Sequence, residues 1–198
     1  MPMLLLLSVL LLTPSHLSAQ WHLALATGPA TTSGHSRDDL DPEHAEILPD
    51  HPATWSVGTS REQGAWRLRI DGSHITSDLA IRGSTTSLVT RDALSAWGVG
   101  LEVSHHLLGI AASPALWGGL GLIGERWSFS TTGGDSRWRA ALRGSLQLDL
   151  PFSTRLAALV RGEAFVGSSL FTADELPEGY SRHAAFRAGL LLGVSRQW

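Results

Sequence analysis

The chain has 198 residues, a formal net charge of −3, 43% hydrophobic residues and no cysteine. This length fits one domain with a sizeable core, and the lack of cysteine excludes disulfides, thiolate metal sites and a lipid-anchored N-terminal cysteine. With a small negative net charge, the chain has no excess of basic residues that would attract nucleic acid. All fifteen of its basic residues are arginine.

Residues 1–19 have the pattern of a secretory signal peptide. An apolar run from Leu4 to Leu12 is followed by a polar segment with Pro14 and a small-residue cleavage site that ends at Ala19. The run is about half of the ~20 residues that a membrane-spanning helix needs, and no later stretch is apolar enough to span as a helix. We therefore expect a mature domain at residues 20–198 that crosses any membrane with strands.

An alternation of apolar and polar residues predicts eight strands in the mature domain, because a period of two excludes a helix. The strands are expected at about residues 21–28, 54–60, 66–71, 95–108, 115–130, 139–150, 155–167 and 183–198. Short turns alternate with longer polar connections, of which residues 29–52, 74–94 and 168–182 are the long loops. An even strand number with this alternation predicts an all-β fold, a closed antiparallel up-and-down transmembrane β-barrel.

The predicted strand at residues 115–130 leaves its two faces unassigned. Leu120 and Leu122 share their parity with Arg126, whereas Trp117 and Trp127 share theirs with Glu125. Either a bulge switches the faces or one ionic residue lies near the outer rim.

Tryptophan gives a second indication of a membrane, because its amphipathic ring prefers the headgroup layer. All eight tryptophans fall at predicted strand ends, four to each rim, and predict an aromatic girdle. The girdle comprises Trp21, Trp66, Trp117 and Trp198 at the periplasmic rim and Trp55, Trp97, Trp127 and Trp138 at the outer rim.

These features resemble the small eight-stranded outer-membrane barrels of Gram-negative bacteria, of the OmpA and OmpX types. In that family the last strand ends in an aromatic residue preceded by alternating apolar residues, which the barrel-assembly machinery recognises. Leu190, Leu192, Val194 and Trp198 match this assembly signal, whereas Arg196 departs from it. The resemblance is architectural and covers residues 20–198, and it implies a multi-pass location in the cell outer membrane after export.

An eight-stranded barrel has an interior only wide enough for its own side chains. The charged residues of the polar faces should therefore pair inside it, because an unpaired buried ion costs several kcal/mol. Those expected to point inward are Arg67, Arg69, Asp71, Glu102, Arg139, Arg143, Asp149, Arg155, Arg161, Glu163 and Arg187. Near mid-height, Glu102, Arg143, Arg161, Glu163 and Arg187 predict a polar network that plugs the lumen, with Arg143 or Arg187 on Glu163.

No catalytic, cofactor or metal site is predicted. Ser181, His183 and Glu178 lie close in sequence, but Ala185 stands where a lipid A deacylase, whose His and Ser are two apart, would have its serine. His105 and His106 point to opposite faces of a strand and cannot ligate one metal together. The acidic loop at residues 29–52 has no calcium-loop spacing and is interpreted as solvated chain.

Three classes of function remain open. The first is a non-enzymatic monomeric envelope barrel whose long loops carry recognition or surface protection. The second is a conduit for small solutes or hydrophobic compounds, and the third a secreted or periplasmic soluble barrel that binds a ligand on an inward apolar face. The expected partners are outer-membrane lipids and lipopolysaccharide, with the assembly machinery and periplasmic chaperones during biogenesis and no nucleic acid.

Overall fold

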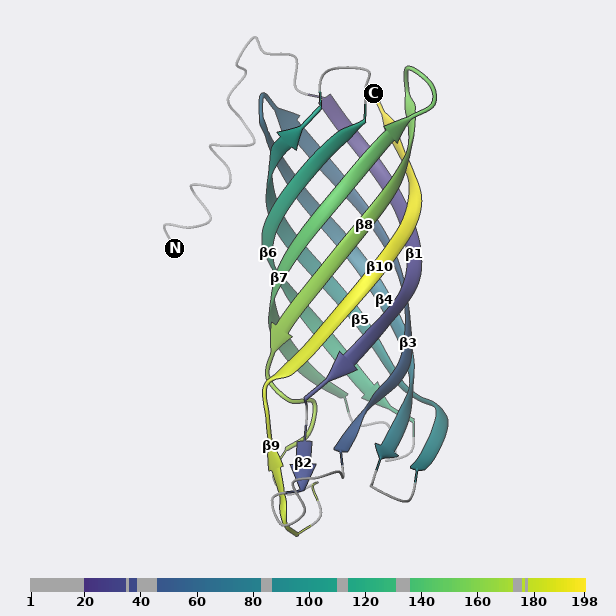
Figure 1. Cartoon of the computed structure of the whole chain (residues 1–198), viewed down its shortest axis with the longest axis vertical. Helices are drawn as coiled ribbons and strands as arrows, with labels where there is room; N and C mark the ends of the chain where they lie inside the picture. Colours follow the sequence, from purple (N-terminus) through teal and green to yellow (C-terminus); the bar gives the residue numbers. More distant parts are fainter. Residues whose placement is uncertain are drawn as a thin grey trace.

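The computed structural model describes residues 20–34, 36–38, 46–82, 87–109, 114–130, 136–172, 176 and 178–198. The predicted signal peptide, residues 1–19, lies outside the described residues. Eight long strands form the wall: β1 (Gln20–Ser33), β3 (Glu46–Gln63), β4 (Trp66–Arg82), β5 (Ser87–Leu108), β6 (Ala115–Phe129), β7 (Ser136–Pro151), β8 (Leu156–Gly167) and β10 (Ala185–Gln197). Two short strands, β2 (Ser36–Asp38) and β9 (Tyr180–Arg182), lie beyond one end (Figure 1). No helix in the described part of the chain is long and apolar enough to cross a membrane.

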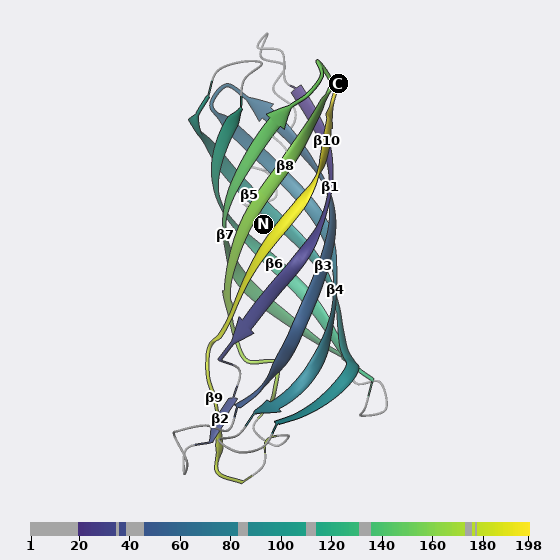
Figure 2. The same cartoon turned by 45° about the vertical axis from the view of Figure 1, so that its right-hand side comes forward.

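The eight long strands close into a ring. Each pairs antiparallel with its neighbours in the order β1, β10, β8, β7, β6, β5, β4, β3, and the pairing of β1 with β3 completes the circle. The seam between the first and last strands is hydrogen-bonded to the end of the chain, where Trp21 and Trp198 exchange backbone N–H···O bonds of 3.3 and 3.1 Å. The predicted closed up-and-down barrel is confirmed, and Figure 2 shows the strongly tilted strands from a second side.

The strand register sets the tilt. A path from partner to partner once around the wall leaves β7 at Leu148 and returns to β7 at Trp138, ten positions earlier in the sequence. A shear of this size in an eight-stranded barrel corresponds to a tilt of about 40° and to an interior that side chains fill. The register partners between Leu148 and Trp138 on this path are, in order, Val160, Leu192, Thr27, Trp55, His74, Trp97 and Arg126.

The two ends of the barrel differ. The end that carries Gln20, Trp198 and the short turns is called here the terminal rim, and the end that carries β2 and β9 is called the loop rim (Figure 1). At the loop rim β2 pairs with both β3 and β9, so that the sheet extends past the closed wall.

The apolar face of the wall points outward. The exposed side chains include leucines and valines from every part of the ring, such as Leu25, Val99, Leu122, Leu142 and Leu192. The buried side chains on the opposite face include arginines and carboxylates. The soluble alternative required the apolar face to turn inward, and this orientation excludes it.

Several strands are longer toward the loop rim than the sequence pattern predicts. Much of the predicted 74–94 loop is strand, because β4 continues to Arg82 and β5 begins at Ser87. The alternation is interrupted there by register shifts between Asp50 and Ala53 and between Ser77 and Leu79. His51 and Asp92 adopt positive φ angles of 47° and 49° near these shifts. A bulge moves the following residues to the other face, and this hides the strand from a simple two-residue pattern.

Candidate functional site

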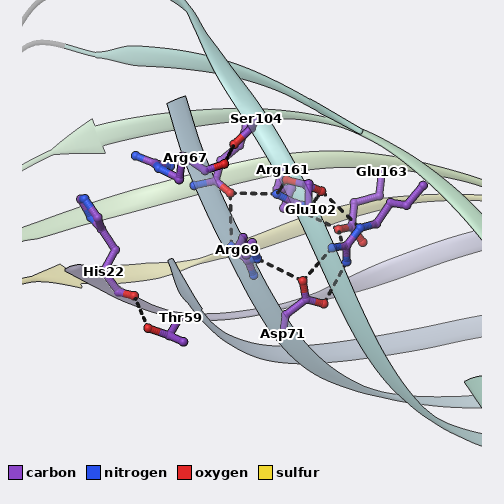
Figure 3. A network of polar contacts seen from close by, with 11 residues as sticks. His22, Thr59, Arg67, Arg69, Asp71, Glu102, Ser104, Arg161 and Glu163 are labelled. Carbon is purple, nitrogen blue, oxygen red and sulfur yellow. Dashed lines mark hydrogen bonds and ion pairs between the residues drawn. The ribbon is translucent and has the colours of Figure 1, made fainter. Parts of the chain in front are cut away.

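Ion pairs cross the interior of the barrel between distant strands. Asp71 on β4 accepts two hydrogen bonds from Arg143 on β7, at 2.8 and 2.7 Å. Glu102 on β5 accepts two from Arg161 on β8, one of them at 3.1 Å from Nη1. In both cases the partners lie three strands apart in a ring of eight. These bidentate pairs therefore tie opposite walls together, and Figure 3 shows the cluster around Glu102.

Further polar groups connect the two pairs into one cluster. Arg143 Nε lies 3.2 Å from a Glu102 oxygen, so that Glu102 serves two arginines. Gln147 accepts from Arg161 at 3.1 Å and donates to Asp149 at 2.7 Å. Asp149 in turn accepts from Arg67 at 3.0 Å. This lumen network contains Arg67, Arg69, Asp71, Glu102, Arg143, Gln147, Asp149, Arg161 and Glu163.

Of the two predicted partners of Glu163, the structure places Arg143 within ion-pair distance of this carboxylate and Arg187 elsewhere. Its closest arginine is Arg161 on the same strand, at 2.6 Å, whereas Arg143 is at 3.8 Å. Arg187 does not pair with Glu163; it donates to Glu125 on β6, which the sequence left unassigned. The reason is the height of Arg187, which lies opposite Phe165, two positions closer to the loop rim than Glu163.

Two other arginines lie outside this network. Arg155 was expected inside, but it lies exposed in the turn after β7, because that strand ends at Pro151. Arg139 faces inward near the loop rim and donates to the carbonyl oxygen of Leu170 at 3.1 Å.

Inward glycines make room for the long charged side chains. A Cβ atom on Gly119 would lie 2.7 Å from both Glu102 Oε1 and Ser145 Oγ, and one on Gly100 would lie 3.0 Å from the Arg143 guanidinium. Ala24 and Ala26, which have the smallest side chains after glycine, are also buried in the interior. Sequence parity places Gly100 on the same face as Glu102, whereas the inward direction of Gly119 and the role of the small residues become visible only once the strands are in register.

Replacing Gly119 by valine should lower the free energy of unfolding by about 1–3 kcal/mol, because it overpacks a filled interior and pushes Glu102 from its arginines. Urea unfolding in lipid vesicles measures this. Gly144→Val is the matched control, since Gly144 faces outward and a Cβ there would meet only Leu120, at 4.0 Å. Equal losses in the two variants would contradict the assigned role of Gly119.

A second, apolar cluster fills the interior near the loop rim. Its buried members are Ile47, Ile75, Ala93, Leu94, Ala96, Trp127, Phe129, Leu170 and Phe171. Leu170 and Phe171 follow β8 in the chain and are 3% and 7% exposed, so this connection folds into the mouth of the barrel. Leu176 and Tyr180 pack against the cluster from the same connection.

The predicted aromatic girdle is wrong for two of its eight members. Trp117 and Trp127 are each 3% exposed and face the interior, because they share the inward face of β6 with Glu125. Trp117 packs under the Arg67 guanidinium at 3.9 Å, and Trp127 donates its indole N–H to Glu125 at 2.9 Å. The register of β6 shifts only at its end, so Arg126 is the ionic residue that faces outward at the rim.

The other six tryptophans are exposed on the outer face. Trp21, Trp66 and Trp198 lie toward the terminal rim, and Trp55, Trp97 and Trp138 lie further toward the loop rim. His74 lies between two of them, with ring centroids 5.8 Å from Trp55 and 4.4 Å from Trp97. This distribution is typical of residues at the two interfaces of a membrane.

The proposed assembly signal lies on the outer face of the last strand. Leu190, Leu192, Val194 and Trp198 are all exposed and lie on the same face of the chain. Their recognition by an assembly machinery stays a prediction.

Two of the residues discussed as possible catalytic groups, Ser181 and His183, are in contact. Ser181 Oγ lies 3.0 Å from His183 Nε2, and both side chains are near the protein surface. Among the described residues no carboxylate is seen to orient His183, and no three histidine or acidic side chains are grouped to hold a metal. His105 packs against Trp66, and His106 against Trp117 on the other face, as their parity requires.

The closed ring, its outward apolar belt and its ionic interior define the class of this protein, a membrane-spanning β-barrel of the outer-membrane type. The structure is similar to that of Neisserial surface protein A, with a TM-score of 0.60, 9% identity and coverage of 89% of this chain and 96% of that one. It is also similar to the outer membrane protein OprG from Pseudomonas aeruginosa, with a TM-score of 0.59, 10% identity and coverage of 93% and 98%. No protein-family model and no curated protein matches the sequence. At these identities the similarity establishes the fold.

Proposed function

We propose that this protein is a non-conducting barrel of the outer membrane that acts through the segments at its loop rim. The observation that carries the proposal is the set of ion pairs between opposite walls, Arg143 with Asp71 and Arg161 with Glu102. These bonds cross the path that a solute would take. In this function the wall is an anchor, and recognition or surface protection belongs to the loop-rim segments.

The packing of the interior supports a closed lumen at two heights. Beside Asp71, Arg143 and Arg187 lies a cavity of about 10 Å³, which is roughly the space of one water molecule. Nearer the loop rim, the apolar cluster with Leu170 and Phe171 covers the mouth. An ion would have to break buried charge pairs and then cross this apolar layer.

Reconstitution into a planar lipid bilayer tests the proposal. We expect no discrete ion-conductance steps from the folded protein, because an ion would have to separate the buried charge pairs that cross the lumen. Insertion is checked on the same sample by heat-modifiable migration in gel electrophoresis and by co-flotation with vesicles. Reproducible steps from inserted protein would overturn the closed lumen.

A conduit is the second candidate function, and one observation favours it. β8 ends at Gly167, opposite Ala141 of β7, so the strand pairing between β7 and β8 stops before the loop-rim end of β7. A cavity of about 40 Å³ lies at this point and is lined by inward residues such as Phe165 and by the outward residue Phe186. It would need to widen to admit a solute, and conductance steps in the bilayer measurement would support this alternative.

A further inference from the structure

The outer face near the loop rim carries an arginine between two tryptophans. Arg126 on β6 is directly opposite Trp97 on β5 and Trp138 on β7. All three side chains point away from the barrel and are exposed, the tryptophans by 59% and 68%. Neighbouring residues in one register row have Cβ atoms about 4.5–5.5 Å apart, so the three side chains form one continuous patch.

A row of hydroxyl groups lies next to this patch on its loop-rim side. Ser95, Ser128 and Ser136 pair with one another across the same three strands, two positions along from Trp97, Arg126 and Trp138. Arg126 donates from Nε and Nη2 to Ser136 Oγ, at 3.1 and 2.9 Å. The guanidinium is therefore turned toward the hydroxyl row and away from the leucines below it.

The charge of Arg126 has no counter-ion among the described residues. Its hydrogen bonds there go to the neutral Ser136, whereas Arg143 and Arg161 in the lumen are paired with carboxylates. The outward positions of β5 from Ser95 and of β6 and β7 contain no acidic residue. On the terminal side the next outward residues are Gly124 and Ala140, and beyond them lie Leu122 and Leu142 of the apolar belt.

A guanidinium group at the margin of an apolar belt is stabilised when an anion lies beside it and neutralises its charge. The planar fork of arginine matches the oxygens of a phosphate, and hydroxyl groups add neutral donors. Tryptophan prefers the headgroup layer, where its ring can contact sugar and acyl carbons while its N–H stays hydrated. The anion that occurs at this height of a membrane is the phosphate of a lipid headgroup.

We propose that Arg126, Trp97, Trp138 and the serine row form a binding site for a phosphate-bearing glycolipid of the outer leaflet. The inference rests on the proposed placement in the outer membrane, with the loop rim outside. The patch faces sideways into the lipid instead of upward into solvent, which favours a membrane lipid over a free anion. Arg126 binds the phosphate, the serines add hydrogen bonds to phosphate or sugar oxygens, and the tryptophans pack against the lipid.

The test uses the full mature barrel refolded in a maltoside detergent, which has no phosphate of its own. Binding of diphosphoryl lipid A and of its dephosphorylated form is titrated by native mass spectrometry for the wild type, Arg126→Gln and Arg196→Gln. Arg196 is the matched control, because it is also an exposed outward arginine but lies on β10 near the terminal rim. Inorganic phosphate is added in a separate competition.

We expect the wild type to bind the diphosphoryl form at least about tenfold more tightly than the dephosphorylated form, as a charge-assisted contact implies. Arg126→Gln should lose this discrimination, Arg196→Gln should keep it, and millimolar inorganic phosphate should leave it unchanged. The proposal is overturned if the wild type does not discriminate, if Arg126→Gln discriminates like the wild type, or if Arg196→Gln loses as much. It is also overturned if inorganic phosphate displaces the lipid, because the site would then take a free anion.

The same samples separate this proposal from the proposed function. Heat-modifiable migration and co-flotation with vesicles report whether each variant is a folded membrane barrel. Failure of the wild type in those measurements contradicts the membrane placement itself. A wild type that inserts normally but does not discriminate between the two lipids contradicts only the lipid site.

Discussion

Glu102→Gln is expected to lower the free energy of unfolding by about 3–5 kcal/mol, the cost of leaving a buried charge without its partner. Glu102 is 1% exposed and serves both Arg161 and Arg143. An amide oxygen can accept one of these bonds, but it cannot balance the charges of two buried guanidinium groups. Urea titration of the barrel in phosphatidylcholine vesicles, followed by tryptophan fluorescence, measures the loss.

Two further variants separate the charge effect from a general sensitivity to mutation. Glu178→Gln makes the same chemical change at an exposed position and should alter stability by less than about 0.5 kcal/mol. The double variant Glu102→Gln with Arg161→Met removes one charge of each sign from the lumen network, so the remaining charges balance, and it should be more stable than Glu102→Gln alone. A Glu102→Gln barrel as stable as the Glu178→Gln barrel would show that the lumen network contributes no stability.

The sequence predicts the wall of this barrel well where each strand has one apolar and one ionic face. In β7 and β8 the contrast between leucines or valines outside and arginines inside is strong enough to fix both the strand and its orientation. It fails in β4 and β5 near the loop rim, where serine and threonine give little contrast and Ser77 precedes a register shift. Amphipathic patterns identify a strand only while its two faces continue to differ.

The inward residues are predictable from parity, but their partners are not. Parity places Arg187 and Glu163 on the inner face, where the sequence alone allows them to pair. The ion pair of Arg187 depends on which residue of β6 reaches the same height across the lumen, and this is Glu125. Height is set by the shear of the whole ring, which no local segment of sequence encodes.

For the tryptophans, too, the sequence predicts the position along the strand but not, in every case, the face of the wall to which the side chain points. Their position near strand ends follows from the sequence, whereas the direction of Trp117 and Trp127 depends on the face that Glu125 occupies. Because both faces of β6 contain an ionic residue, its alternation alone leaves the choice open. The cross-lumen pair of Glu125 with Arg187 is consistent with one choice only.

A change on the outer face tests the property on which the membrane assignment depends. Leu120 points outward from β6 and is 76% exposed. Leu120→Arg should lower the free energy of unfolding in a bilayer by about 2–4 kcal/mol, because it places a charge near the middle of the hydrocarbon.

The control variant Leu156→Arg should lower the free energy of unfolding by about 0–1 kcal/mol, since Leu156 begins β8 at the terminal rim, close to the interface. The two variants make the same substitution of an exposed leucine, so only their depth in the lipid distinguishes them. A soluble barrel would tolerate both equally, and equal losses in the vesicle titration would therefore contradict a belt that meets acyl chains.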